Sequence, residues 1–311
     1  MSLTVFHDPG FAAPIGPHIM PIRKFALVAE ALRDVNDIEI LSPAPVTRDD
    51  LLRVHTPAYI DAVATGAPRD LAESQKFPWA PELYPSVCLT SGGLLAAARL
   101  ALKTGISAAL ASGFHHSHAD HGEGFCTFNG LIVTLEALRH AGLIRTAAVL
   151  DLDLHYGNGT AALAATRPWI RALSIYGNDY ANNFAYRDVS IRQHTDGPNH
   201  LSVPLVPTGG PDGDMLREIL AQHLPWLTLG TPPDIILYQA GADPLRDDPY
   251  SPLDLTHADL RARDKMVFDF AKNAGVPLAW VLAGGYTKDV TQVVQAHVNT
   301  ALACLEVYSS S

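Results

Sequence analysis

The feature that most constrains the fold is a regular alternation of short apolar runs with longer helix-forming stretches. Eight runs are apolar, often β-branched, and bounded by turn residues or predicted helices, which is typical of strands. They are LTVFH (3–7), IEIL (38–41), SAALA (107–111), TAAVLDLD (146–153), IRALSIY (170–176), LSVPL (201–205), DIILYQA (234–240) and PLAWVLA (277–283). Most are apolar throughout, as in parallel strands that helices cover on both faces.

Helix signals fill the intervals between these runs. The stretches 91–105 and 129–142 are rich in Ala and Leu and close on a glycine. Thr256 followed by Asp259 predicts the N-terminal cap of another helix. A final helix is expected to begin after Tyr286 and run to the C-terminal region.

Strands that alternate with helices throughout predict one open, doubly wound α/β domain over residues 1–311, with a mainly parallel sheet of about eight strands. The proline-rich segment 77–85 is expected to be a loop. The polar segment 178–200 is too long for a plain connection and is expected to be a functional loop.

The composition narrows the class of protein. With 48% hydrophobic and 17% charged residues, the composition indicates a globular rather than a disordered protein. Its net charge of -10 argues against direct binding to nucleic acid, which needs a basic face. No apolar run approaches the ~20 residues that span a bilayer, and the start lacks a signal-peptide pattern. Three cysteines without CxxC spacing indicate reduced thiols, so a cytoplasmic protein without a membrane partner is expected.

Two carboxylates and an imidazole end one predicted strand, in the segment DLDLHYGNGT. Because side chains two apart share a face of a strand, Asp151, Asp153 and His155 are expected to point the same way. They lie at the strand's carboxyl end, where open α/β sheets place ligands. Buried carboxylates need compensation, and a divalent cation supplies it. The alternative is that the end of this strand is exposed and that its aspartates are simply solvated.

A second predicted strand ends in Asp243, within YQAGADPL. Two aspartate oxygens and one histidine nitrogen that converge from different strand ends form a three-ligand site with an open position, which is typical of a catalytic metal. Oxygen and imidazole ligands without thiolate fit Zn²⁺ or Fe²⁺.

A third segment, GFHHSHADHGEGFCTFNG (113–130), follows the predicted strand 107–111. His115 and His116 lie at the strand mouth, where an imidazole can take a proton from metal-bound water. His118 and His121 are expected to be ordinary loop residues.

A fourth segment, LAGGY, places Tyr286 at the same rim. A tyrosine there usually serves packing, but beside a metal its phenol can hydrogen-bond the oxygen on which charge develops.

In this order the four segments resemble the zinc-dependent histone deacetylase superfamily, within the arginase/deacetylase fold. The likeness includes tandem His followed by Gly-Phe-Cys, DxDxH followed by Gly-Asn-Gly-Thr, Gly-Ala-Asp, and Gly-Gly-Tyr. It covers most of the chain, because DLLRVHTPAYIDAV is similar to the family's early helix and DDPYSPLDLT to its segment after the third ligand. The segment TSGGLLAAARLAL and the short length are closest to class IV deacetylases and their bacterial relatives.

The resemblance implies a role for each matching residue. The implied metal ligands are Asp153, His155 and Asp243. His116 becomes the main general base and acid, and Asp151 supports an electrostatic role of His115.

Further implied roles concern the carbonyl, the substrate and a second ion. Tyr286 would polarise the carbonyl, Gly124 would form the channel floor, and Phe125, Tyr180 and Tyr250 would line the channel or its mouth. The family's potassium site would use the Asp151 side chain with backbone carbonyls of Asp153, His155, Ser174 and Ile175.

Three positions depart from the family pattern. Asn158 stands where class I members have an aspartate that supports the second histidine, which tunes the basicity of His116 differently. Ala283 replaces the first glycine of Gly-Gly-Gly-Tyr and affects the freedom of Tyr286. Tyr250 stands where many members have Leu or Met, so the mouth differs in shape and polarity.

The implied activity is amide hydrolysis: removal of acetyl or other acyl groups from lysine side chains or lysine-like amines by metal-activated water. His116 serves as general base and acid, Tyr286 stabilises the oxyanion, and Zn²⁺ or Fe²⁺ together with K⁺ are the implied cofactors. Acylated lysine or another acylated amine is the implied partner.

Three alternatives stay open at this stage. The substrate is a protein lysine, or else an acetylpolyamine or small metabolite. A two-metal ureohydrolase needs further carboxylates, but Gly157 and Pro244 stand where these are expected. A non-catalytic binder of acylated amines predicts loss of a ligand, of the base or of the tyrosine, and all are present.

Overall fold

The computed structural model describes residues 2–180, 193–194 and 197–309, and these contain one eight-stranded sheet. Its strand order is β2-β1-β3-β8-β7-β4-β5-β6, and every neighbouring pair is parallel. The strands are β1 (Leu3–Phe6), β2 (Ile38–Leu41), β3 (Ile106–Ser112), β4 (Ala147–Asp151), β5 (Ile170–Tyr176), β6 (His200–Pro204), β7 (Ile236–Ala240) and β8 (Leu278–Leu282). All eight predicted strands are therefore confirmed, with bounds that differ by up to two residues.

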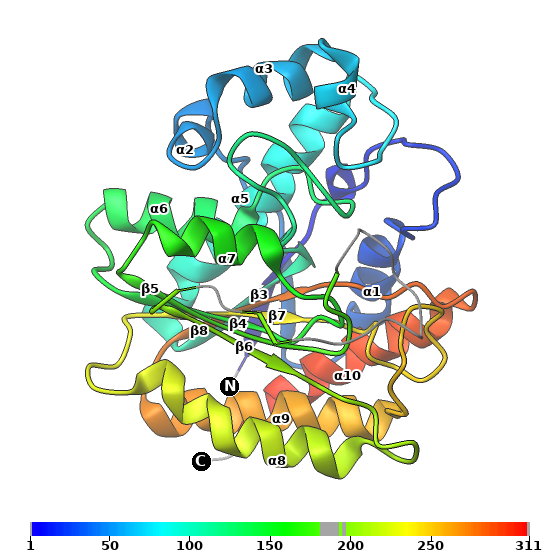
Figure 1. The fold of residues 1–311 in the computed structure, drawn as a ribbon, viewed down its shortest axis with the longest axis vertical. Helices are drawn as coiled ribbons and strands as arrows, with labels where there is room; N and C mark the ends of the chain where they lie inside the picture. The colour runs from blue at the N-terminus through cyan, green and yellow to red at the C-terminus, as the bar shows by residue number, and fades with distance from the viewer. Residues whose placement is uncertain (1, 181–192, 195–196, 310–311) are drawn as a thin grey trace.

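Helices cover both faces of the sheet (Figure 1), which explains why the central strands are apolar throughout. One layer contains α5 (Leu83–Thr104), α6 (Gly130–His140) and α7 (Asn158–Ala165). The other contains α8 (Gly213–His223), α9 (His257–Ala274) and α10 (Val290–Ser309), with α1 (Lys24–Leu32) beside α10. The other helices among the described residues are η1 (Pro9–Phe11), α2 (Arg48–Leu52), α3 (Pro57–Thr65), α4 (Arg69–Ala72) and η3 (Leu224–Thr228).

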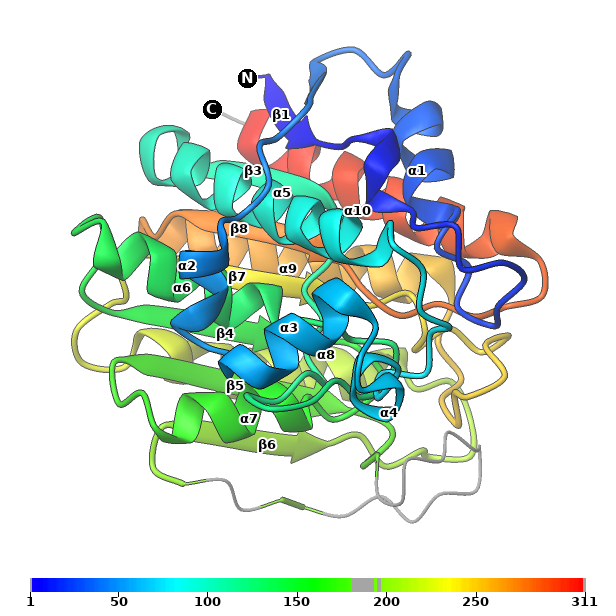
Figure 2. The ribbon, with the colours of Figure 1, turned by 90° about the horizontal axis from the view of Figure 1, so that it is seen from above.

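The strand order brings four strand ends together. Chain order would place β4 beside β3, but β8 and β7 lie between them, as the view from above shows (Figure 2). The carboxyl ends of β3, β8, β7 and β4 are therefore neighbours in the middle of the sheet. This is where doubly wound sheets form their ligand crevice.

Two helix boundaries illustrate local rules. Thr256 and Asp259 form a complete capping box at the start of α9, as predicted. The prediction of a loop through residue 85 is wrong, because α5 begins at Leu83 and includes Pro85. A proline is tolerated in the first helical turn, where backbone N–H groups have no partner within the helix.

Helix α5 also corrects an expectation about membranes. At 22 residues it is long and apolar enough to cross a bilayer by length and composition, although no such stretch was expected. Within the protein, 67% of its most apolar window is buried. It packs on β3 and β8, and core helices of this kind share the composition of membrane spans.

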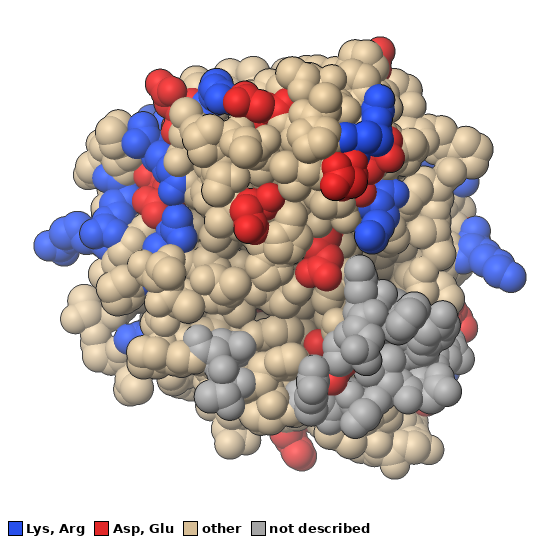
Figure 3. Space-filling view, turned by 45° about the horizontal axis from the view of Figure 1, so that its top comes forward, with Lys and Arg blue, Asp and Glu red and all other residues tan. Residues whose placement is uncertain are grey.

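Charge is mixed on the face of the molecule shown in Figure 3. Lys and Arg residues lie among Asp and Glu residues there and form no continuous basic surface. Basic side chains gather along the left of this view with acidic side chains among them, so the charge there is mixed in sign.

Candidate active site

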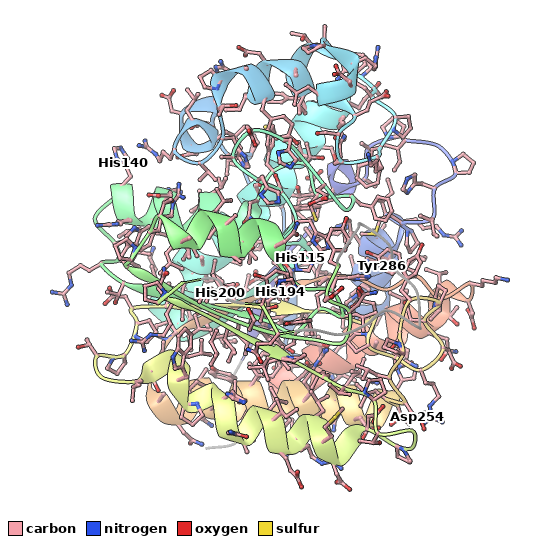
Figure 4. The ribbon with its side chains drawn as sticks, viewed as in Figure 1. His115, His140, His194, His200, Asp254 and Tyr286 are labelled. Carbon is pink, nitrogen blue, oxygen red and sulfur yellow. The ribbon has the colours of Figure 1, made fainter. Side chains whose placement is uncertain are left out.

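The sequence motifs lie at the carboxyl ends of the four central strands. His115 and His116 follow β3, the segment from Asp151 to His155 follows β4, Asp243 follows β7 and Tyr286 follows β8. Figure 4 shows His115 and Tyr286 at the same end of the sheet. Residues far apart in sequence therefore meet because of the strand order.

Asp153, His155 and Asp243 form a buried cluster that can hold a metal ion. Their candidate ligand atoms all lie within 4.8 Å of one another. His155 Nδ1 lies 3.1 Å from Asp153 Oδ1 and 3.1 Å from Asp243 Oδ2. All three side chains are at most 5% exposed, so water does not solvate the two carboxylates well.

The electrostatics of this cluster favour a cation. Burial and the neighbouring Asp153 raise the pKa of Asp243 to about 7. Burial would also raise the pKa of Asp153, but His115 and His155 outweigh it and hold that pKa well below its usual value. Two buried carboxylates in contact with one imidazole are therefore stabilised by positive charge, which a divalent ion supplies.

Backbone groups fix the two aspartates in place. Gly284 N donates to Asp153 Oδ2 at 2.7 Å, and Leu154 N donates to Asp243 Oδ1 at 3.0 Å. A Cβ atom at Gly284 would lie 1.8 Å from Asp243 Oδ2, so this position has no room for a side chain. The glycines of the GAD and AGGY segments therefore allow the turns after β7 and β8 to approach the ligands.

Asp151 lies against His115, which is the partner that the family resemblance implies. Strand β4 ends at Asp151, so the two-residue alternation does not continue to Asp153 and His155. Instead Asp151 Oδ2 lies 2.6 Å from His115 Nδ1. Asp151 Oδ1 also accepts a hydrogen bond from Asp153 N at 3.1 Å, so Asp151 contacts both His115 and the backbone of the ligand segment.

The tandem histidines lie against each other but differ in their partners. Their ring centroids are 4.0 Å apart. His115 contacts the carboxylate of Asp151, whereas His116 Nδ1 lies 2.6 Å from the neutral Asn158 Oδ1. Burial and the charges of His115 and His155 hold the pKa of His116 well below its ordinary value, so it is a neutral proton acceptor at neutral pH.

Tyr286 lies beside the ligand cluster. Its ring centroid is 6.1 Å from that of His155 and 5.1 Å from that of Tyr250. Its backbone N–H donates to Asp248 Oδ2 at 2.7 Å. Burial raises its pKa well above the usual value, so the phenol keeps the proton it needs as a hydrogen-bond donor.

Aromatic rings surround the two histidines and Tyr286. Tyr180 stacks on His116 with centroids 3.9 Å apart, and Phe125 lies 6.2 Å from Tyr286. A Cβ at Gly124 would lie 2.3 Å from His116 Cδ2, which places this glycine against the base. Of the predicted channel residues, Tyr180 and Tyr250 therefore lie near His155, whereas Gly124 and Phe125 lie near His116 and Tyr286. Most of the predicted loop 178–200 lies outside the described residues.

The Oγ atom of Ser174, in β5, is buried and has no hydrogen-bond partner among the described residues. Ser174 is the register partner of Asp151 across β4 and β5, and Ile175 follows it. An orphaned oxygen beside a buried carboxylate fits the chemistry of a monovalent cation that takes oxygen ligands.

Sequence reasoning missed several charged residues of the site. Lys24 is fully buried, donates to the carbonyl of Ala283 and is near Asp243 and Asp153, while burial lowers its pKa to about 8. Arg263 Nη1 donates to the carbonyls of Leu152 and Gly241 at 3.2 and 2.7 Å. Neither lies in a motif with a recognisable spacing, so the chain pattern alone did not distinguish them from surface charges.

A second group of potential metal ligands lies in the loop after β3. Candidate atoms of His118, His121 and Glu123 are within 4.8 Å of one another. However, the two rings are stacked at 4.6 Å with an interplanar angle of 8°. Lone pairs lie in the ring planes, so nearly parallel stacked rings do not aim them at one ion. The expectation that His118 and His121 are loop residues fits this geometry.

The chain is similar to known proteins over most of its length. The histone deacetylase domain profile matches residues 18–302. An uncharacterized protein of Picosynechococcus is 30% identical over 99% of this chain and 100% of its own length. A histone deacetylase-like amidohydrolase of Pseudomonas aeruginosa is 30% identical over 81% of this chain and 67% of its own length.

A solved structure, the HDA15 HD domain, superimposes with a TM-score of 0.76 at 21% identity and covers 99% of this chain and 91% of that one. The fold is therefore the one predicted, of the arginase/deacetylase type.

Proposed function

The chain belongs to the histone deacetylase family, and on that premise we propose that it is a metal-dependent amidohydrolase that removes acetyl or other acyl groups from lysine side chains or lysine-like amines. One observation carries the proposal: the buried Asp153, His155 and Asp243 cluster adjoins a neutral imidazole and a protonated phenol. This is the donor set that metal-assisted hydrolysis of an amide requires.

Two ions complete the proposed site. Asp153, His155 and Asp243 would hold Zn²⁺ or Fe²⁺, which supplies Lewis-acid activation of water and of the acyl carbonyl. K⁺ would take the Asp151 side chain and the backbone carbonyls of Asp153, His155, Ser174 and Ile175, and the orphaned Ser174 Oγ supports a cation there.

His116 acts as the general base and acid. Its Nδ1 is engaged by Asn158, which leaves Nε2 to take a proton from water and return it to the departing amine. Burial disfavours the charged form of His115, but Asp151 and Asp153 outweigh it and raise its pKa, which favours positive charge beside the reaction.

Tyr286 donates its hydroxyl proton in a hydrogen bond to the oxygen that develops charge, an interaction typically worth ~3 kcal/mol. The rings of Phe125, Tyr180 and Tyr250 pack around an acylated aliphatic chain and exclude water, which strengthens both the phenol and the imidazole interactions.

A substrate panel tests this proposal. The protein is loaded with one defined metal and given acetyl-lysine peptides, longer acyl-lysine peptides and acetylpolyamines. We expect turnover of at least one class, loss of most activity in His116→Ala, and a fall in kcat of roughly 100-fold in Tyr286→Phe.

The classes in the panel also separate the alternatives. Preference for a free acetylpolyamine or small acylamine would favour a metabolite deacylase, which the net charge of -10 also suits. If metal-loaded protein bound these compounds but left all of them intact, the hydrolase would be contradicted in favour of a non-catalytic binder.

A further inference from the structure

The side-chain amide of Asn158 is held at both ends. Its Oδ1 lies 2.6 Å from His116 Nδ1, and its Nδ2 donates to Glu123 Oε2 at 2.7 Å. The same Nδ2 lies 3.2 Å from His118 Nε2. Asn158 thus links the proposed general base to a carboxylate in the loop after β3.

The orientation of this amide decides which nitrogen of His116 carries the proton. An amide oxygen only accepts, so with Oδ1 toward the ring, Nδ1 must carry the hydrogen and Nε2 keeps its lone pair. If the amide were flipped, its N–H would face Nδ1 and favour the opposite tautomer. In that tautomer Nε2 is already protonated and cannot take a proton from water.

Glu123 is the group that opposes the flip. A carboxylate only accepts hydrogen bonds, so a flipped amide would bring two oxygens together at about the 2.7 Å now occupied by a hydrogen bond. Hydrogen bonds from His118 and Asn158 lower the pKa of Glu123, although burial opposes this. Glu123 is therefore ionised at neutral pH and remains an acceptor.

Glu123 is itself fixed by a tight turn. Its N–H donates to Cys126 O at 3.2 Å, and Cys126 N–H donates to Glu123 O at 2.7 Å. The two central residues, Gly124 and Phe125, both have positive φ, at 50° and 64°. This is the geometry of a type I′ hairpin turn, which positions the Glu123 carboxylate and the Phe125 ring together.

We propose that Glu123 is a positioning residue that acts through Asn158 to hold His116 in the tautomer whose Nε2 is free. The role rests on the proposed function for its kinetic consequence, but the tautomer exists without turnover. Glu123 thereby takes over the orienting function that a carboxylate in direct contact would serve at position 158.

The first experiment observes the tautomer directly. Metal-loaded protein labelled with ¹⁵N-histidine is examined by NMR, with the His116 signals assigned by their loss in His116→Gln. We expect a protonated Nδ1 in the original protein and in Glu123→Gln, whose amide oxygen still accepts from Asn158. Glu123→Ala is expected to populate both tautomers, and an unchanged signal in that variant would overturn the proposal.

The second experiment is kinetic. Glu123→Ala is expected to lower kcat about tenfold, the size of one lost charge-assisted hydrogen bond, with KM changed less than about twofold. Asp120→Ala is the matched control, because Asp120 lies in the same loop but pairs with His121. A kcat in Glu123→Ala equal to that of the control would contradict the proposal.

A double substitution separates orientation from general damage. Asn158→Asp places a second carboxylate against Glu123, and the repulsion is expected to lower kcat. Adding Glu123→Gln to that variant supplies an N–H donor to the introduced carboxylate and is expected to raise kcat again. Absence of this rescue in folded, metal-loaded protein would count against the proposal.

If no substrate is turned over, the proposed function fails, and the NMR result alone still decides the role of Glu123.

Discussion

At the scale of residues, two adjacent histidines acquire opposite properties from their neighbours. Burial disfavours the charged form of both His115 and His116, but the Asp151 and Asp153 carboxylates raise the pKa of His115. His116 contacts an uncharged amide, and burial together with the neighbouring His115 and His155 rings lowers its pKa. The pKa values of two adjacent histidines therefore shift in opposite directions, and no feature of the dipeptide itself predicts which one rises.

Another histidine predicts how stability depends on pH. His55 is buried in contact with His118 O and Asn129 N, and burial lowers its pKa to about 4 from the ordinary 6.5. The unfolded chain binds a proton at His55 more tightly than the folded protein does. The folded protein therefore has its full free energy of unfolding, as far as His55 is concerned, above pH 6.5. As pH falls from about 6.5 to about 4, protonation of His55 in the unfolded chain lowers the free energy of unfolding by ~3 kcal/mol.

Urea unfolding at several pH values measures this loss. His55→Asn keeps a donor near His118 O but does not titrate, so it is expected to be less stable at neutral pH with a shallower decline between pH 6.5 and 4. The same slope in both proteins would show that His55 does not contribute.

At the scale of elements, the turns after β7 and β8 shape the ligand cluster. The GAD and AGGY segments bring backbone so close to Asp243 and Asp153 that side chains are excluded at Gly241 and Gly284. Only glycine therefore fits at these two positions beside the candidate metal ligands.

Gly284→Ala tests this close approach. The added methyl group would overlap Asp243 Oδ2, so the carboxylate must move, and metal affinity is expected to fall at least tenfold. Gly210→Ala is the matched control, because a Cβ there meets nothing within 4 Å. Competitive titration with a metal indicator measures both, and equal affinities would contradict the predicted crowding.

Helix α9 is connected to these turns by Arg263. This buried guanidinium donates to the carbonyls of Leu152 and Gly241 and pairs with Asp264 at 2.8 Å. Arg263→Leu leaves a buried carboxylate without its cation, and the expected loss in free energy of unfolding is about 3–5 kcal/mol.

Chemical denaturation of the metal-free original protein and of metal-free Arg263→Leu measures this loss in free energy of unfolding without a contribution from metal binding. Arg261 lies on α9 like Arg263 but makes an exposed ion pair with Glu306 of α10, so Arg261→Leu is the control and is expected to lose under about 1 kcal/mol. A similar small loss in both variants would contradict the role of Arg263.

At the scale of the whole molecule, the strand order creates the site. β7 and β8 insert between β3 and β4, so motifs more than 100 residues apart in sequence meet at one edge. The eight strands and the polar residues at their ends were predictable, because apolar runs and misplaced charges leave a local signal. The strand order left no local signal in the sequence and was not predicted.

The unpredicted residues have a common physical cause. Lys24, Arg263 and Glu123 lie in helices or loops where charged residues are usually solvated, and only the packed structure shows that the first two are buried. The loop predicted through residue 85 was wrong because a first-turn proline reads the same as a loop proline. The catalytic, substrate-binding and ion-binding roles assigned to the residues of the site remain predictions.

The account depends most directly on a metal ion between Asp153, His155 and Asp243. Anomalous diffraction at the zinc edge, from crystals of zinc-loaded protein, locates that ion. We predict one strong peak about 2.1 Å from an oxygen of each aspartate and from a nitrogen of His155. A strong peak at His118, His121 and Glu123 with none in the buried cluster would contradict the account.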